Sequence, residues 1–124
     1  MQTTRYLFSK SLRLNKASEF KDLFRLGKKL SCRYFAIYIK PNNLSYARLG
    51  IVVAKKAVRL AANRNKIKRA IRENFRLNQM LVAGYDILVV GYDPINTLDK
   101  IELRQILNQQ WKKLLSSCVK FSSV

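Results

Sequence analysis

The sequence predicts the elements helix, strands, helix, strand, helix, and this order indicates an α+β or α/β sandwich in which a small sheet packs against helices. The chain has 124 residues, of which 48% are hydrophobic, so a single domain (1–124) with a substantial core is expected. It carries 25 Lys and Arg against 7 Asp and Glu, which gives a formal net charge of +18. Such self-repulsion indicates a polyanionic partner, and nucleic acid fits better than an anionic membrane surface or an acidic protein.

The N-terminal part is expected to form a basic, poorly ordered arm over residues 1–15, followed by a short helix over 16–26. Phe20, Leu23 and Phe24 recur at helical spacing, and Gly27 is of the residue type that favours the position after a helix end.

Three strands are expected next. Residues 34–39 alternate in period two, which separates one face (Phe35, Ile37, Ile39) from the other (Tyr34, Ala36, Tyr38). Pro41-Asn42-Asn43 ends this strand, and residues 46–54 form the second. Residues 87–90 are a continuous apolar run, which is typical of a central strand covered on both faces.

The last helix has the strongest local signals. Asp99 and Glu102 have the spacing of a capping box, and Leu98 with Leu103 forms a hydrophobic staple. Its expected core stripe consists of Leu103, Ile106, Leu107, Gln110, Trp111, Leu114 and Cys118. Residues 119–124 are expected to be a tail.

Residues 61–81 predict an amphipathic helix with a cationic face. Its apolar arc holds Ile67, Ala70, Ile71, Phe75, Leu77 and Leu81. Its polar arc holds Asn65, Lys68, Arg69, Arg72 and Arg76, with Lys66 beside them and Arg64 near the seam; Lys55, Lys56 and Arg59 precede it. Most charge runs are only solvated surfaces, but those mix signs, whereas Glu73 is the sole acid here. Like charges at i,i+4 are mildly destabilising, and we therefore favour a binding function for this face.

Three aromatic residues could line a groove beside this basic surface if the first helix packs near the sheet edge. Phe20, Phe24 and Tyr38 could offer stacking surfaces for the bases of single-stranded RNA. The alternative is that both phenylalanines are ordinary core residues at i,i+4.

Several kinds of chemistry lack the residues that they need. The chain has no His, its acids show no paired spacing for a two-metal nuclease, and its four glycines form no phosphate-binding loop. Cys32 and Cys118 are expected to be reduced packing residues without a disulfide. We find no signal peptide and no apolar run long enough to span a membrane, so a cytoplasmic location is expected.

The basic segment also resembles a known family. Ala54-Lys55-Lys56, Arg64-Asn65-Lys66-Ile67-Lys68-Arg69 and the following Ile71-Arg72-Glu73-Asn74-Phe75-Arg76 resemble the bacterial ribonuclease P protein. The resemblance spans about residues 12–113 and includes Phe20-x-x-x-Phe24, Arg33-x-Phe35 and Arg48-x-Gly50. The family's Arg-Asn-Arg is Arg64-Asn65-Lys66 here, and lysine lacks the bidentate guanidinium fork.

The resemblance implies a fold and a mechanism. The fold is a small mixed sheet packed with helices, like the second domain of a ribosomal S5-type protein, with a left-handed β-α-β crossover where general rules favour a right-handed one. The implied function is that of the non-catalytic protein subunit of ribonuclease P, an endoribonuclease whose catalytic RNA holds Mg²⁺ and removes the 5′ leader of precursor tRNA. No catalytic residue, metal site or small-molecule substrate is expected in the protein itself.

The resemblance also assigns residues to two sites. The implied leader-binding cleft consists of Phe20, Phe24, Tyr38, Lys56, Arg64 and Asn65. Contacts with the catalytic RNA and its phosphates are expected from Arg33, Arg48, Lys55, Arg59, Lys66, Lys68, Arg69, Arg72 and Arg76.

Three other functions compete with this one. A structural RNA binder, such as a ribosomal protein of the same fold, would share the composition but not the Lys-Lys and Arg-Asn-Lys segment. A DNA-binding module would mix base-reading side chains with its cations. A free-standing nuclease would need clustered acids or His.

Overall fold

The computed structural model describes residues 13–14 and 16–122, with side chains described up to residue 114. The elements are α1 (Ala17–Leu26), β1 (Lys28–Ser31), β2 (Phe35–Pro41), β3 (Arg48–Val53), α2 (Ala61–Asn78), β4 (Tyr85–Gly91), a 3₁₀ turn (Asp93–Thr97) and α3 (Lys100–Ser122). The expected α+β class is thus confirmed, and the three predicted helices and three predicted strands are all present.

The four strands form one mixed sheet in the order β1-β2-β4-β3. β4 is central, because it pairs antiparallel with β2 and parallel with β3. The helix α2 therefore forms the crossover between two parallel neighbouring strands. The left hand of this crossover stays a prediction.

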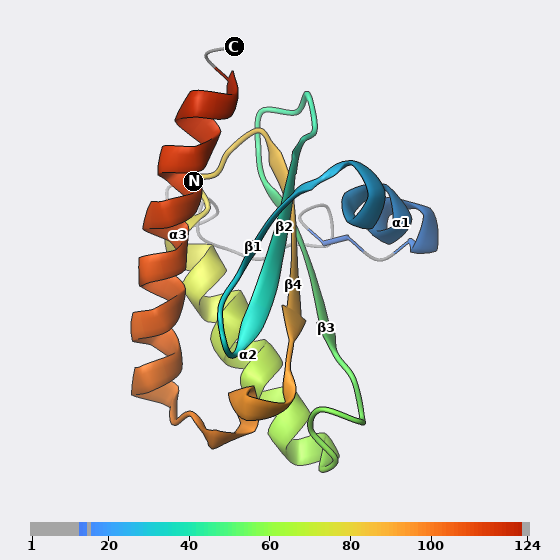
Figure 1. Ribbon diagram of the computed structural model, residues 1–124, viewed down its shortest axis with the longest axis vertical. Coiled ribbons are helices and arrows are strands. Elements are labelled where there is room, and N and C mark those ends of the chain that lie inside the picture. The colour runs from blue at the N-terminus through green and yellow to red at the C-terminus, as the bar shows by residue number, and fades with distance from the viewer. Residues whose placement is uncertain (1–12, 15, 123–124) are drawn as a thin grey trace, which may run out of the picture.

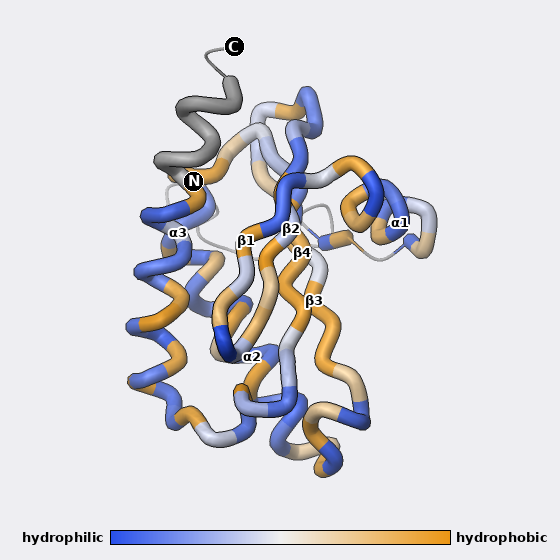
Figure 2. The backbone as a smooth tube through the Cα atoms, viewed as in Figure 1, coloured by the Kyte–Doolittle hydropathy of each residue, from blue (hydrophilic) through white to orange (hydrophobic). Residues whose placement is uncertain are grey.

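The sheet separates two layers of helices. Figure 1 shows α2 and α3 on one side of the sheet and α1 on the other. The side under α2 and α3 holds the main core, in which Phe35, Ile37 and Ile87 meet Ile71 and Trp111. The side under α1 holds a smaller cluster of Leu14, Leu23 and Leu88, with Phe20, Tyr38, Val52 and Val90 partly buried against it. Figure 2 shows the same division, with the largely hydrophobic strands β2, β4 and β3 flanked by helices that alternate between hydrophobic and hydrophilic residues.

The signals predicted for the N-terminus of α3 are confirmed. The backbone N–H of Glu102 donates to Asp99 Oδ1 at 2.8 Å, and the backbone N–H of Asp99 donates to Glu102 Oε1 at 3.0 Å. Leu98 and Leu103 lie in the same core cluster. In the stripe behind them, Leu103, Leu107, Gln110, Trp111 and Leu114 are buried, while the side chain of Cys118 lies outside the described part.

The break after β2 also takes its predicted place. Asn43 has a φ of 59°, in the left-handed region that Asn tolerates. The side chain of Asn42 accepts a hydrogen bond from the backbone N–H of Leu44 at 2.8 Å, as in an Asx turn.

Several details differ from the expectation. Gly27 follows α1 with a φ of −76°, so it does not adopt the left-handed backbone conformation for which glycine is usually favoured at a helix end. Glycine fits here for a different reason, because a Cβ at this position would lie 2.5 Å from the carbonyl oxygen of Leu23. Leu77 and Leu81, placed on the apolar arc, are 58% and 56% exposed. Leu81 follows the end of α2, where helical spacing no longer applies, and Leu77 borders a groove beside α3. Tyr34 precedes β2 and packs with the main core.

Near both ends of the chain, some residues that were expected to be irregular take part in the fold. Most of the predicted arm (1–15) lies outside the described residues, but Leu14 is buried and its N–H donates to Leu49 O at 2.8 Å. α3 continues to Ser122, through part of the segment expected as a tail. Cys32 is a free thiol, and among the described helices none is long and apolar enough to cross a membrane.

Candidate nucleic-acid interface

The three aromatic residues singled out from the sequence meet on the α1 side of the sheet. The rings of Phe24 and Tyr38 lie edge to face with centroids 4.9 Å apart, and Lys29 Nζ lies 5.6 Å from the centre of the Tyr38 ring. Phe24 is 49% exposed although Leu23 beside it is fully buried. Phe24 therefore presents its ring to solvent and is not the core residue that helical spacing alone would favour.

Phe20 packs closely against the sheet at a position where β3 has a glycine. A Cβ at Gly50 would lie 2.8 Å from Phe20 Cε1, so the bare backbone of β3 makes room for this ring. Phe20 is half-buried against the cluster under α1. The result is a platform of three rings at the edge of that cluster.

An apolar strip continues from this platform along the sheet. The register pairs Tyr38 with Leu88 and Leu88 with Gly50; two residues further on, it pairs Ala36 with Val90 and Val90 with Val52. Val52 and Val90 are only partly buried, so this end of the sheet face remains accessible. The strip leads towards the end of β3, where Lys55 and Lys56 are exposed.

The loop after β3 is tied to the first turn of α2. Arg64 Nη1 donates to Val58 O at 2.9 Å and to Arg59 O at 2.8 Å, which fixes the loop against the helix. The N-cap of α2 is Leu60, which makes no side-chain capping bond, and the first turn has no acid. Backbone N–H groups and the positive end of the helix dipole are therefore open to an anion beside Lys56 and Asn65.

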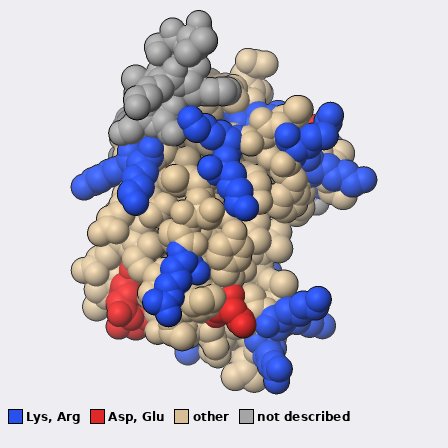
Figure 3. Space-filling view, in the orientation of Figure 1, with Lys and Arg blue, Asp and Glu red and all other residues tan. Residues whose placement is uncertain are grey.

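The cations of α2 spread over the side away from the core. Asn65, Lys66, Arg69 and Arg72 are exposed, and Lys68 and Arg76 are half-buried. In the described part of the chain, Arg76 has an ion-pair partner, Glu73, while no ion pair is formed by Lys68 or Arg72. The hydrogen bond from Arg76 is the main reason that the pKa of Glu73 is lowered, with smaller contributions from Lys100 and Arg104. Figure 3 shows how strongly Lys and Arg outnumber acids on the face that it displays.

Arg48 is placed differently from the other predicted phosphate contacts. Its Nε and Nη2 donate to the two carboxylate oxygens of Asp86 at 2.8 and 2.7 Å, and its Nη1 donates to Glu19 at 3.0 Å. The hydrogen bond to Asp86 is the main cause that raises the pKa of Arg48. Because its guanidinium is occupied, Arg48 links α1 to the sheet, and this geometry does not favour its predicted role in phosphate binding.

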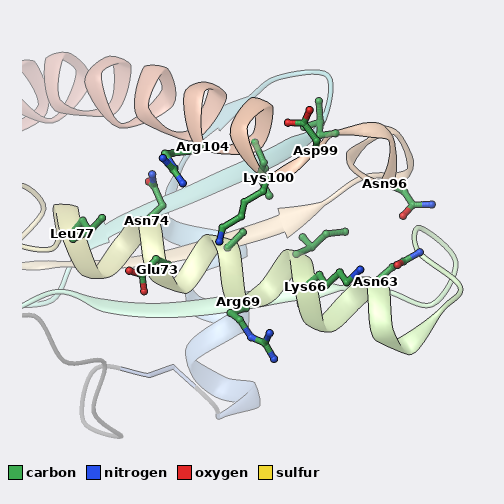
Figure 4. Close-up of a pocket in the computed structure, with 14 residues that line it drawn as sticks. Asn63, Lys66, Arg69, Glu73, Asn74, Leu77, Asn96, Asp99, Lys100 and Arg104 are labelled. Carbon is green, nitrogen blue, oxygen red and sulfur yellow. The ribbon is translucent and has the colours of Figure 1, made fainter.

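The other predicted residues fall into separate groups. Phe20, Phe24 and Tyr38 lie together, and Lys55, Lys56, Arg64 and Asn65 lie at the far end of β3 and the start of α2. Arg33 is exposed in the β1–β2 turn, with its guanidinium carbon 5.8 Å from the centre of the Tyr34 ring. Lys66 and Arg69 border a groove between α2 and α3, and the side chain of Arg69 extends from α2 away from α3 (Figure 4).

The groove between α2 and α3 was not expected from the sequence. It has a volume of about 830 Å³, and Lys100 and Arg104 of α3 lie on its rim (Figure 4). The i,i+4 spacing of Lys100 and Arg104 could have indicated a cationic edge on α3. The capping box and the apolar stripe, however, indicated only a helix that packs against the core. Among the described residues, no group of three or more Asp, Glu, Cys and His side chains could hold a metal ion.

Comparison with known proteins gives consistent results. The family model described as Ribonuclease P matches residues 8–115. The ribonuclease P protein component of Histophilus somni strain 2336 is 41% identical over 106 residues, which cover 86% of this chain and 89% of that one. The component from Azotobacter vinelandii is 39% identical over 111 residues, covering 89% and 85%.

Solved structures show the same likeness. The RNase P protein of Staphylococcus aureus superposes with a TM-score of 0.80 at 33% identity, covering 85% of this chain and 96% of that one. The RNase P protein of Thermotoga maritima gives a TM-score of 0.73 at 35% identity, covering 82% and 96%.

Proposed function

The chain belongs to the ribonuclease P protein family, and from this premise we propose that it binds the catalytic RNA and the 5′ leader of precursor tRNA. In this proposal the RNA subunit carries the Mg²⁺-dependent cleavage that removes the leader, and the protein contributes binding and positioning. The cytoplasmic location expected from the sequence stays a prediction.

The observation that carries the leader assignment is the ring pair of Phe24, which is half exposed, and Tyr38, which is partly buried, on a sheet face that leads to cations. A leader is a single strand of variable sequence, so stacking suits it better than base-edge recognition, because every base has a flat face. Phosphates that follow the stacked bases along the apolar strip reach Lys56, Asn65 and the open N-terminus of α2. The aromatic platform thus matches the bases of a single strand, and the cationic end of the strip matches its phosphates.

The catalytic RNA is assigned to the outward side of α2. Lys68 and Arg72 have no ion-pair partner in the described part of the chain, and their positive charge is therefore available to phosphates. Charge of this sign between two RNA molecules also reduces their mutual repulsion. We therefore expect the protein to lower the Mg²⁺ concentration that assembly and cleavage need.

The first test measures 5′ processing of precursor tRNA by ribonuclease P RNA at low Mg²⁺, with and without the protein. Cleavage only when both are present supports the proposal. Cleavage by the protein alone would overturn the assignment of chemistry to the RNA, and tight RNA binding without stimulation would favour a structural RNA binder.

The second test addresses the cleft. Loss of one stacked base costs about 1–3 kcal/mol, so Phe24→Ala should weaken binding of leader-bearing precursor roughly 5- to 150-fold and leave mature tRNA nearly unchanged. Tyr38→Ala should act in the same direction. Leu26→Ala is the matched control, because Leu26 is 60% exposed on the same helix and is not part of the ring pair. Equal losses for precursor and mature tRNA would exclude leader binding at these rings.

A further inference from the structure

The groove between α2 and α3 combines an apolar floor with a cationic rim. Figure 4 shows the two helices side by side, with pocket residues contributed by both. Its apolar lining consists of Ile67, Ala70, Leu77, Leu98 and Leu103. Its volume of about 830 Å³ lies in the range of sites for small ligands, and is smaller than a folded partner would need.

The rim carries an excess of positive charge, because four cations border the groove and its two acids, Glu73 and Asp99, offset them only in part; Glu73 interacts electrostatically with Lys100 and Arg104. Lys66, Lys100 and Arg104 border the groove and form no ion pair within the described residues. In Figure 4, Lys100 and Arg104 extend from α3 towards α2. The two acids of the groove are already engaged, since Asp99 caps α3 and Glu73 binds Arg76.

The groove also offers polar groups for a planar ligand. Asn63 and Asn96 lie at one end of it (Figure 4), and their amides can both donate and accept hydrogen bonds. The guanidinium plane of Arg104 is a further surface on which a base can stack.

We propose that this groove is a second RNA-binding site, which takes an unpaired nucleotide of the catalytic RNA. The base lies on the floor at Ile67, Ala70 and Leu103, and its phosphate lies beside Lys100 and Arg104, with Lys66 towards the other end of the groove (Figure 4). This inference rests on the proposed function, because it requires that the catalytic RNA is bound.

Two observations assign the site to the catalytic RNA and not to the leader. The groove lies on the face of the sheet opposite the aromatic platform, so a leader on Phe24 and Tyr38 is separated from it by the sheet. The groove is, however, continuous with the outward cations of α2, because Lys66 and Arg69 border both. An RNA segment bound along α2 therefore reaches the groove by crossing one helix.

The test compares two variants with the same change in charge. Lys100→Gln/Arg104→Gln removes two cations from the rim, and Gln105→Glu/Gln109→Glu lowers the net charge by two on exposed positions of α3 that do not line the groove. The measurement is the dissociation constant of the full chain with ribonuclease P RNA over a range of salt concentrations. We expect the rim variant to bind roughly tenfold more weakly than the control. The slope of log K against log salt should become shallower by about 0.7–0.9 for each phosphate that the rim variant no longer neutralises.

A neutral variant tests the floor independently. Ala70→Phe places a ring in the groove without changing charge, and it should weaken binding of the RNA at unchanged salt slope. Thermal unfolding of each variant shows whether it folds. If either the rim variant or Ala70→Phe fails to fold, the RNA affinity of the other one tests the groove site. Equal affinity losses for the rim variant and its control, or full affinity of folded Ala70→Phe, would overturn the groove site.

The outcome also separates this inference from the function that it rests on. If the unmodified chain fails to bind the catalytic RNA, the proposed function is wrong. If it binds tightly and the groove variants bind equally well, only the groove assignment is wrong. Discrimination between precursor and mature tRNA should be the same in the rim variant as in the unmodified chain.

Discussion

Replacing Arg48 by methionine should destabilise the fold strongly, because it leaves a buried carboxylate without its cation. Asp86 is 4% exposed and accepts from Arg48 at 2.8 and 2.7 Å; after the change its nearest remaining donor is Asn42 Nδ2 at 3.0 Å. Breaking a buried pair on one side costs about 3–5 kcal/mol. Since the Arg48 side chain is 24% exposed, we expect the lower end, about 3 kcal/mol, and a fall in Tm of roughly 10 °C for a domain of this size.

The measurement is the free energy of unfolding in urea, followed for Arg48→Met, Asp86→Asn and the double variant. Asp86→Asn removes the charge and keeps an oxygen for Asn42, so the double variant should recover a large part of the stability. Arg48 also holds Glu19 of α1 at 3.0 Å, and its removal should reduce the preference for leader-bearing precursor because α1 carries Phe24. A destabilisation below about 1 kcal/mol, as for an exposed surface pair, would refute the assignment of Arg48 as a buried anchor.

Three further predictions concern the glycine beneath the platform, the acid on α2 and the role of charge. Gly50→Ala brings a Cβ to within 2.8 Å of the Phe20 ring, so it should destabilise the fold by about 1–3 kcal/mol and weaken leader discrimination; an unchanged Tm would contradict the close approach. Glu73→Gln removes a carboxylate whose pKa is lowered in the folded state. This lowered pKa contributes stability above pH 4.5, and that contribution is lost as the pH falls through the lowered pKa. Because Glu73 is exposed, the difference at pH 7 should stay below about 1 kcal/mol and disappear in acid, and a difference that persists at pH 2 would exclude this cause. Affinity for ribonuclease P RNA should fall roughly 10³- to 10⁵-fold between 50 and 200 mM salt if 6–10 phosphates are contacted, and a flat profile would contradict electrostatic binding.

The parts of the fold that carry local signals could be predicted from the sequence. The capping box at Asp99 and Glu102, the alternation in β2 and the apolar run in β4 all depend on neighbouring residues, and each has the expected structure. β1 could not be predicted, because its sequence Lys-Lys-Leu-Ser is mostly exposed and has no apolar alternation. It is a strand because the edge of β2 offers it hydrogen-bonding partners, and this is a property of the sheet rather than of the segment.

The site shows the same limit in its side chains. Helical spacing cannot separate Leu23, which is fully buried, from Phe24, which is half exposed, since α1 covers only part of its sheet face. Arg48 was grouped with the phosphate contacts through the family resemblance, and its acidic partners could not be recognised because they are 29 and 38 residues away in the sequence. The groove arises mainly from two helices that are separated in the sequence by β4 and the 3₁₀ turn, so no single segment predicts it.

The central position of β4 has a consequence for protein synthesis. β2 and β3 are not neighbours; β4 lies between them and pairs with both, and it is the last strand to be translated. Every residue assigned to the leader cleft and to the cationic side of α2 precedes Tyr85 in the chain. A nascent chain that has left the ribosome only as far as α2 thus contains these side chains without the surface that they form. These side chains can therefore form one surface only after β4 has been translated, and the main core is complete only with α3.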